Sequence, residues 1–212
     1  MLTPIAVLLG ILGSGWGFVA DRIGARWPAH DDGGVRPIDW RTPVAVITGG
    51  LAFAALPGRF AEPVPALIFG GYLAALTVLL ATDLDQRLLP DVITLPAIPL
   101  ALAVDLLGVN PLVPPGVIPV AILVAIALPG LMYLLSLPFG AGAFGQGDVK
   151  LLVSVGLLAG PFRMFSGVLY GMVLAAVVIL VLMAFRRITL KSYIPLGPFL
   201  IFGAIWAILV VP

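Results

Sequence analysis

The sequence contains no cysteine and a single histidine, His30, and only 10% of its 212 residues are charged. Without cysteine there are no disulfide frameworks, thiol nucleophiles or cysteine-based zinc sites, and one histidine cannot build a histidine metal cluster. Any hydrolytic chemistry must therefore rest on carboxylates, hydroxyls or water, and no metal site is expected. The 11 Lys and Arg residues are scattered rather than gathered into a basic stripe, so no nucleic-acid partner is expected either.

Apolar residues are what the sequence has in abundance, at 61% of the chain with a mean hydropathy of +1.20. A soluble domain is roughly one quarter charged, so this composition predicts an all-α, polytopic protein of the lipid bilayer. A helix needs about 20 apolar residues to cross the hydrocarbon core. Runs that predict about eight transmembrane helices lie near residues 2–20, 43–57, 64–82, 92–109, 116–138, 149–160, 165–185 and 194–211. The run at 149–160 is too short to cross at full thickness unless it begins inside the membrane.

The distribution of Lys and Arg predicts the orientation, because cytoplasmic loops hold the excess of these residues. With the N-terminus outside, nine of them lie inside and two lie outside. The inside set is Arg22, Arg26, Arg36, Arg41, Arg87, Lys150, Arg186, Arg187 and Lys191, and the outside set is Arg59 and Arg163. The first run lacks a basic start, so we interpret it as a retained span rather than a signal peptide. We expect one transmembrane domain over 1–212, with a short cytoplasmic loop at 21–42.

The acidic residues can be sorted by their depth in this topology. Asp83 closes the third run and Asp148 opens the sixth, so both are expected at the cytoplasmic end of the bundle, although the charge pattern does not show that the two spans are neighbours. Asp105 lies some 20 Å deeper than Asp91 at about 1.5 Å per residue, where it is either functional or extends outward to the interface. Solvated positions are expected for Asp21, Asp31, Asp32, Asp39 and Glu62.

A pair of carboxylates at Asp83 and Asp148 would support hydrolysis. Two like charges held close together cannot both ionise easily, so the pair tends to share one proton. One member can then activate water while the other polarises an amide carbonyl, which is aspartic protease chemistry. Gly145 and Gly147 lack Cβ, so the backbone before Asp148 can take unusual dihedral angles and lie close to an extended peptide. The structural alternatives are an N-cap role for Asp148 and an interfacial position for Asp83.

Three other charged residues lie close to this pair in the sequence. Asp85 is expected to make local surface contacts together with Arg87, and Asp91, which follows Pro90, to cap the fourth span. Lys150 either extends to the membrane interface or holds Asp148 ionised.

Two segments carry distinctive polar motifs: DLDQRLLPD at 83–91 has the form D-x-D-x-x-x-L-P-D, and GQGDVK at 145–150 has the form G-x-G-D-[FV]-K. They resemble the two signatures of the type IV prepilin peptidases, which are GxGD-type intramembrane aspartic proteases. Their order, and their separation of 65 residues (148 minus 83), also match that family. IPLGPFLIFGAI at 194–205 is similar to the family's last span, and GSGWGFVADRIGARWP at 13–28 loosely matches its first span and exit.

The resemblance implies that Asp83 and Asp148 are the catalytic acids of an endopeptidase in the inner membrane. Its substrates would be prepilins or pseudopilins, whose basic leader is cut at the cytoplasmic face just before a hydrophobic helix. A basic leader suits a mouth that bears Asp85 and Asp91. The predicted substrate-binding residues are therefore Gly145, Gly147, Asp85, Asp91 and Lys150.

Methylation of the new N-terminus is a second activity of many bacterial relatives. Those relatives use S-adenosylmethionine and carry a larger first cytoplasmic domain with two cysteine pairs. This chain has no cysteine and a short first loop, so no cofactor is expected, and S-adenosylmethionine would be needed only if methyl transfer is retained.

Two other functions fit the same composition. A small proton-coupled transporter would use buried acids as a relay, but it predicts acids near the middle of the bilayer and broken helices in matching halves. A noncatalytic membrane scaffold would use Asp83 and Asp148 only as caps and anchors.

Overall fold

The computed structural model describes residues 3–29, 33–139, 144–189 and 195–212. These residues form eight α-helices and two short 3-10 turns, at Pro115–Val117 and Leu137–Phe139, with no strand among them. The helices are α1 (Pro4–Gly24), α2 (Arg41–Arg59), α3 (Pro63–Gln86), α4 (Asp91–Leu106), α5 (Ile118–Ser136), α6 (Gln146–Ala159), α7 (Pro161–Ala184) and α8 (Gly197–Leu209). The prediction of an all-α polytopic protein is confirmed.

Four helical segments are long and apolar enough to cross a membrane. They are Pro4–Gly24, Pro63–Gln86, Pro115–Ser136 and Pro161–Ala184, and Gly197–Leu209 is a shorter apolar helix. The other helices, α2, α4 and α6, have 19, 16 and 14 residues. The sixth helix is therefore short, as its sequence predicted. The number of helices that cross the bilayer and the outside position of the N-terminus stay predictions.

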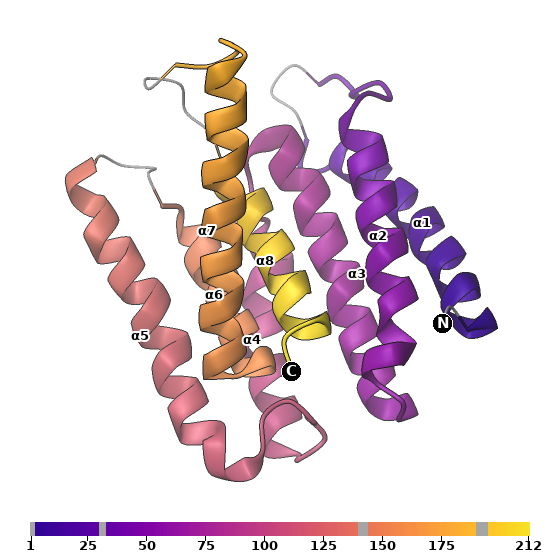
Figure 1. Ribbon diagram of the computed structural model, residues 1–212, viewed down its shortest axis with the longest axis vertical. Helices are drawn as coiled ribbons and strands as arrows, with labels where there is room; N and C mark the ends of the chain where they lie inside the picture. Colours follow the sequence, from indigo (N-terminus) through magenta and orange to yellow (C-terminus); the bar gives the residue numbers. More distant parts are fainter. Residues whose placement is uncertain (1–2, 30–32, 140–143, 190–194) are drawn as a thin grey trace.

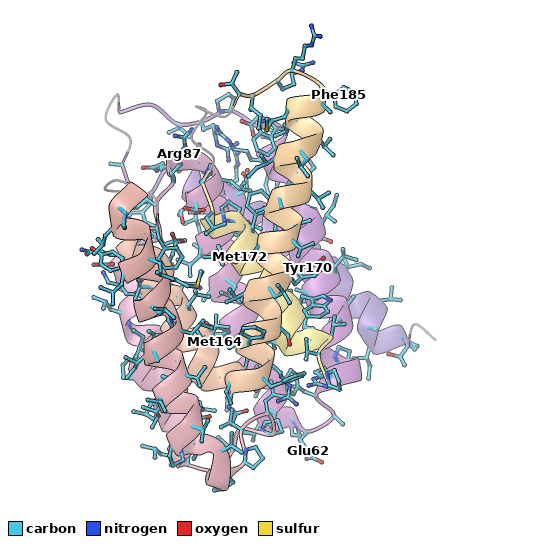
Figure 2. All side chains as sticks on the ribbon, turned by 60° about the vertical axis from the view of Figure 1, so that its left-hand side comes forward. Glu62, Arg87, Met164, Tyr170, Met172 and Phe185 are labelled. Carbon is cyan, nitrogen blue, oxygen red and sulfur yellow. The ribbon has the colours of Figure 1, made fainter. Side chains whose placement is uncertain are left out.

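Consecutive helices run up and down, so alternate helix ends gather together (Figure 1). α1 and α5 lie at opposite edges of the bundle and α8 lies in its middle. Arg87 and Phe185 mark one end and Glu62 marks the other (Figure 2). We name the first of these the Arg87 end; it holds the last turns of α1, α3, α5 and α7 and the first turns of α2, α4, α6 and α8.

Glycines allow the two N-terminal helices to pack with their backbones in contact. A Cβ on Gly13 would lie 2.6 Å from the Cβ of Phe53, and a Cβ on Gly17 would lie 2.7 Å from the Cα of Val46. Gly15, on the same helix, has no neighbouring atom within 4 Å of its Cβ position. Small residues at such interfaces are typical of membrane bundles, where association depends on close van der Waals packing.

We predict that Gly17→Leu separates α1 from α2, while Gly15→Leu is tolerated. Overpacking a tight contact costs roughly 1–3 kcal/mol, whereas a leucine on an open helix face has room and favours the helix. The measurement is the midpoint of thermal unfolding of the purified protein in detergent. Equal midpoints for the two variants would contradict the packing described here.

The first connection is shorter than the predicted loop at 21–42, because α1 continues to Gly24 and α2 begins at Arg41. Asp21 was expected in solvent, and this prediction is wrong: the residue is 0% exposed. Its carboxylate forms ion pairs with Arg22 and Arg36, which replace the water it loses. Four residues used in the predictions, His30, Asp31, Asp32 and Lys191, lie outside the described residues.

Asp105 does not extend outward to the interface. It lies near the end of α4 remote from Asp91, and is 1% exposed. The Asn110 side chain donates a hydrogen bond of 2.6 Å to Asp105 Oδ1 and another of 3.0 Å to the carbonyl of Leu158. Asp105 therefore helps to connect the ends of α4 and α6, far along the bundle from Asp83.

Candidate active site

Asp83 lies in the last turn of α3, at the Arg87 end of the bundle. The helix ends after Gln86 because Arg87 adopts a left-handed conformation with φ of 57°, and its N–H donates to the Asp83 carbonyl at 2.9 Å. The apolar residues that precede Asp83 on this helix, such as Leu76 and Leu80, are fully buried. Asp83 itself is only 4% exposed, so its carboxylate is held at the edge of the apolar core.

Asp148 is the third residue of α6. One alternative predicted that it is the N-cap of this helix, and that prediction is wrong. The N-cap is Gly145, and α6 begins at Gln146. Asp148 Oδ2 accepts a hydrogen bond of 3.0 Å from the Gly145 N–H. This is the half of a capping box in which the third residue binds back to the cap, so the carboxylate fixes the direction in which the chain enters the helix.

Both carboxylates line one cavity of about 390 Å³ at the Arg87 end. The walls come from the last turn of α3, the connection to α4, and the first turns of α4, α6 and α8. The lining residues are Asp83, Arg87, Leu88, Leu89, Asp91, Gly145, Gln146, Gly147, Asp148, Lys150, Pro195, Leu196 and Gly197. The two acids that the sequence placed at one end of the bundle therefore share a cavity.

Gly145 and Gly147 both line this cavity, but they do not adopt unusual dihedral angles. Gly145 has φ of −78° and ψ of 151°, which any residue can adopt, and Gly147 lies within the first turn of α6. That part of the prediction is wrong. The reason for Gly147 is packing instead, since a Cβ there would lie 2.9 Å from the Cβ of Leu89. The start of α6 thus lies directly against the connection between α3 and α4.

Gly197 is a site residue that the sequence analysis missed. It is the first residue of α8, and a Cβ at this position would overlap the carboxylate of Asp83, 2.7 Å from its Cγ. The positive end of the α8 dipole therefore lies against Asp83, where it favours negative charge. A glycine between Pro195 and Pro198, at the start of an apolar run, was the available signal. This pattern indicated that a helix begins near Gly197, but it did not indicate which side chain would lie against that glycine.

Lys150 does not pair with Asp148 in the structure. Its Nζ lies 2.6 Å from Oδ1 of Asp91, the first residue of α4. The N-cap of α4 is Pro90, so the predicted capping role of Asp91 is also wrong. The pair joins the starts of α4 and α6 at the rim of the cavity, where both residues are partly exposed.

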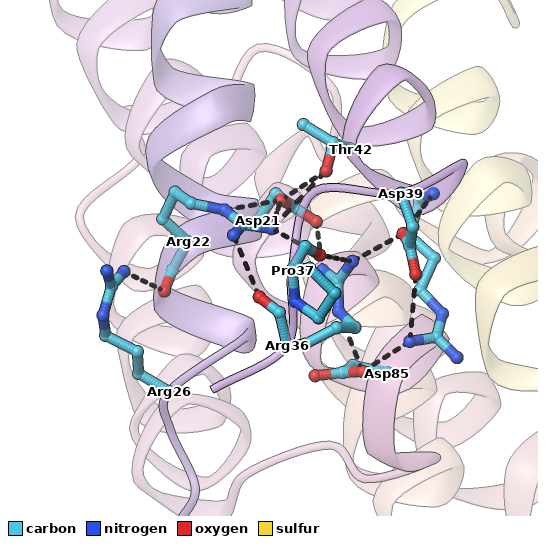
Figure 3. Close-up of polar contacts among 9 residues, drawn as sticks. Asp21, Arg22, Arg26, Arg36, Pro37, Asp39, Thr42 and Asp85 are labelled. Atoms are coloured by element: carbon cyan, nitrogen blue, oxygen red, sulfur yellow. Dashed lines mark hydrogen bonds and ion pairs between the residues drawn. The ribbon is translucent and has the colours of Figure 1, made fainter. Parts of the chain in front are cut away.

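Asp85 is engaged elsewhere and is not among the residues that line the cavity. Its Oδ1 lies 2.7 Å from Arg41 Nη1 and 3.0 Å from Arg36 Nε (Figure 3). A carboxylate in the last turn of a helix opposes the helix dipole, and α3 has no basic residue in that turn. The compensating cations are Arg36, which lies between α1 and α2, and Arg41, the first residue of α2. Asp85 is therefore held by two ion pairs inside the protein, and its contact with substrate stays a prediction.

Arg36 is the centre of this ion network. It pairs with Asp21 on α1, with Asp39 at 2.6 Å and with Asp85 on α3. Burial alone would lower the pKa of Arg36, but these three carboxylates raise it above its usual range, so the guanidinium stays charged. A second contact joins the same segments, because the Gln86 side chain donates to the Pro28 carbonyl at 2.7 Å. The turn that carries Asp83 is thus fixed from the side by the first connection.

The described residues contain no group of three or more His, Cys, Asp or Glu side chains that could hold a metal ion. The polar groups that face the cavity are those of Asp83, Asp91, Asp148, Lys150, Arg87 and Gln146. The chemistry we derive for this cavity therefore uses its carboxylates and water.

The fold and the cavity define a class: a polytopic helical membrane protein with two carboxylates in a cavity at one end of the bundle. Comparison with known proteins supplies the family. The sequence model of the type IV leader peptidase family matches residues 67–181, more than half of the chain and the part that carries both Asp83 and Asp148. The chain belongs to this family.

Curated relatives carry the same family name in more specific form. The chain is 33% identical over 167 residues to the prepilin leader peptidase/N-methyltransferase of Burkholderia pseudomallei (strain 1026b), a match that covers 79% of this chain and 54% of that protein. It is 31% identical over 163 residues to the protein of the same name from Pseudomonas putida, with 77% and 56% covered. The chain thus spans about half the length of the curated relatives it matches. No solved structure matches it.

We predict that Gly197→Ala lowers any peptidase activity of this chain at least about tenfold, because the added methyl group must displace either the Asp83 carboxylate or the start of α8. Gly130→Ala is the matched control, since a Cβ at Gly130 meets no atom within 4 Å. Initial cleavage rates and unfolding midpoints are measured for both variants. Wild-type activity in Gly197→Ala would contradict the close approach of α8 to Asp83.

A further prediction concerns Arg36→Ala, which leaves Asp21 and Asp85 short of a cation. Removing one partner from a buried ion pair typically costs about 3–5 kcal/mol. The unfolding midpoint should fall sharply, and any peptidase activity of the chain should fall with it because the last turn of α3 is no longer fixed. Arg187→Ala, at an exposed residue beyond α7, should change neither quantity. A midpoint for Arg36→Ala equal to that of Arg187→Ala would show that the network does not stabilise the fold.

Proposed function

We propose that this chain is an aspartic endopeptidase that removes the basic leader from type IV prepilins or pseudopilins. The observation that carries the proposal is the shared cavity of Asp83 and Asp148, which come from different helices. Within the described part of the chain, Asp83 Oδ2 is buried and has no hydrogen-bond partner. An unpartnered carboxylate oxygen in a cavity is costly unless water or substrate binds there. The family membership and the names of the relatives support the same reaction.

In the proposed reaction, a water molecule binds between the two carboxyl groups, which together hold one proton. The water oxygen attacks the carbonyl carbon of the scissile peptide bond while the ionised carboxylate accepts a proton from the water. The protonated carboxyl donates its proton to the carbonyl oxygen. The C–N bond then breaks, the amine nitrogen takes up a proton, and the products are a carboxylate and a new N-terminus. The pair titrates as a unit, so the roles belong to the pair and not to one acid.

The charge distribution supports a cytoplasmic position for the cavity. Among the described residues, the Arg87 end carries Arg22, Arg26, Arg36, Arg41, Arg87, Lys150, Arg186 and Arg187, while the opposite end carries Arg59 and Arg163. An excess of Lys and Arg on one side favours the cytoplasm there, which would place the N-terminus outside and the cavity at the inner face of the plasma membrane.

The leader is the part of the substrate that this rim would attract. Asp91 is exposed at the cavity mouth, where it can attract the basic residues of a leader, although Lys150 neutralises part of its charge. Asp85 adds to the local negative potential, but its carboxylate is already paired with Arg36 and Arg41. Direct recognition of the leader therefore falls to Asp91 and to the backbone at Gly145 and Gly147.

Methyl transfer is outside the mechanism that we derive. The names of the relatives include N-methyltransferase, but here the first connection has no cysteine and its charged residues Arg36 and Asp39 are engaged in the ion network. We propose peptide cleavage without a cofactor. S-adenosylmethionine would be required only if a methylated product is found.

We predict that Asp83→Asn and Asp148→Asn each reduce prepilin cleavage at least about 10³-fold, because an amide can neither accept the proton of water nor share one with its partner. The purified protein is incubated in lipid vesicles with a candidate prepilin, with and without S-adenosylmethionine, and the products are weighed by mass spectrometry. Glu62→Gln, an exposed acid at the other end of the bundle, should cleave like the wild type.

Wild-type activity in either asparagine variant would remove that acid from the catalytic pair. An intact precursor together with Asp83-dependent proton flux into vesicles would favour the transporter alternative. A product heavier by one methyl group would show that the second activity is retained.

A further inference from the structure

An apolar groove of about 510 Å³ lies between α3 and α4, beside the catalytic cavity. Small residues of both helices line it, including Gly71 and Ala75 on α3 and Ala97 on α4. Larger apolar residues such as Leu100 complete its walls. The lining is almost entirely hydrocarbon, and Leu100 is exposed on the outer surface of the bundle.

The groove exists because α4 leans away from the helix that precedes it. Helices joined by a connection as short as 87–90 normally pack along each other. Here α4 packs mainly against α6 and makes only slight contact with α3. Pro96 and Pro99 lie inside α4, and each removes a helix hydrogen bond and bends the backbone. A space wide enough for side chains of another helix is therefore left open to the bilayer.

The structure points to one occupant for this groove, namely the hydrophobic helix that follows the cleavage site of the substrate; this inference rests on the proposed function. The cavity and the groove adjoin at the start of α4, where Asp91 lines the cavity and the next residue, Val92, lines the groove. From Val92 to Val104 the groove follows α4 for about 18 Å at 1.5 Å per residue, roughly three turns of a docked helix.

The chemistry of the groove suits such a helix. Inside a bilayer the hydrophobic effect does not drive helix association, so a docked helix is held by close packing against small residues. Gly71, Ala75 and Ala97 would provide that close approach. The polar leader would remain at the rim near Asp91, and the scissile bond, which lies between leader and helix, would then fall beside Asp83 and Asp148.

Another apolar groove is a poorer candidate because it lies farther from the Arg87 end. It lies between α2, α7 and α8, has a volume of about 410 Å³, and includes the stacked rings of Tyr170 and Trp206. On α8 the cavity lining stops at Gly197 and this groove begins only at Phe202. A helix docked there would not continue directly from the cavity.

Gly71→Leu tests the inference because Gly71 lines this groove, and the neighbouring groove between α1, α2 and α3, without packing against the protein. A Cβ at Gly71 has no neighbouring atom within 4 Å, and leucine favours the helix more than glycine does. Two substrates are compared, a full-length precursor with its hydrophobic helix and a short soluble peptide that spans only the cleavage site. We expect kcat/KM for the precursor to fall at least tenfold, mainly through KM, and kcat/KM for the peptide to stay unchanged.

Gly15→Leu, on the open face of α1, is the matched control and should cleave both substrates like the wild type. Wild-type cleavage of the precursor by Gly71→Leu, or an equal loss on both substrates, would overturn the docking site. Failure of the wild type to cleave either substrate would instead overturn the proposed function.

A photo-crosslinking residue gives a second measurement that does not depend on turnover. Placed at Leu100 in the groove, it should capture the precursor, whereas at Leu123, equally exposed on α5, it should capture only lipid. These measurements use Asp148→Asn, which holds the precursor uncut. Capture of lipid alone at Leu100, or of the precursor at Leu123 but not at Leu100, would overturn the inference.

Discussion

The ion pairs of Asp85 with Arg36 and Arg41 are the interaction on which the geometry of the site depends. Two acids, Asp83 and Asp85, stand in the last turn of α3, at the negative end of the helix dipole. The guanidinium groups of Arg36 and Arg41 offset this unfavourable interaction and tie the turn to the first connection and to α2. These two groups neutralise Asp85, and neither of them pairs with Asp83. One acid of the motif is thus structural, and the other is available for chemistry.

The two acids of the cavity are held in different ways. Asp148 is tied to its own chain by the Gly145 N–H, whereas Asp83 is surrounded by apolar side chains and by the backbone of Gly197. When two paired carboxyl groups have different surroundings, the one with more solvent or more hydrogen bonds ionises first. The shared proton then stays mainly on the other carboxyl group. The apolar core beneath the cavity also separates this pair from Asp105, a buried acid near the opposite end of the bundle.

Much of the architecture could be predicted because each helix carries its own signal. Apolar runs located all eight helices to within a few residues, and the alternation of loops put Asp83 and Asp148 at one end. What could not be predicted were partners from distant segments: Arg36 for Asp85, Asp91 for Lys150 and Gly197 for Asp83. These depend on which helices become neighbours. Hydropathy does not specify which helices become neighbours, because an apolar helix face is as stable against lipid tails as against another apolar helix face.

The shortness of α6 has a consequence for the surrounding lipid. Its 14 residues rise about 21 Å, less than the roughly 30 Å hydrocarbon layer that the longer helices match. A crossing by α6 therefore requires the bilayer to thin or dip near this helix, so that headgroups and water reach the level of Asp148. In that case bilayer thickness controls how much water enters the cavity, and the membrane becomes a structural component of the site.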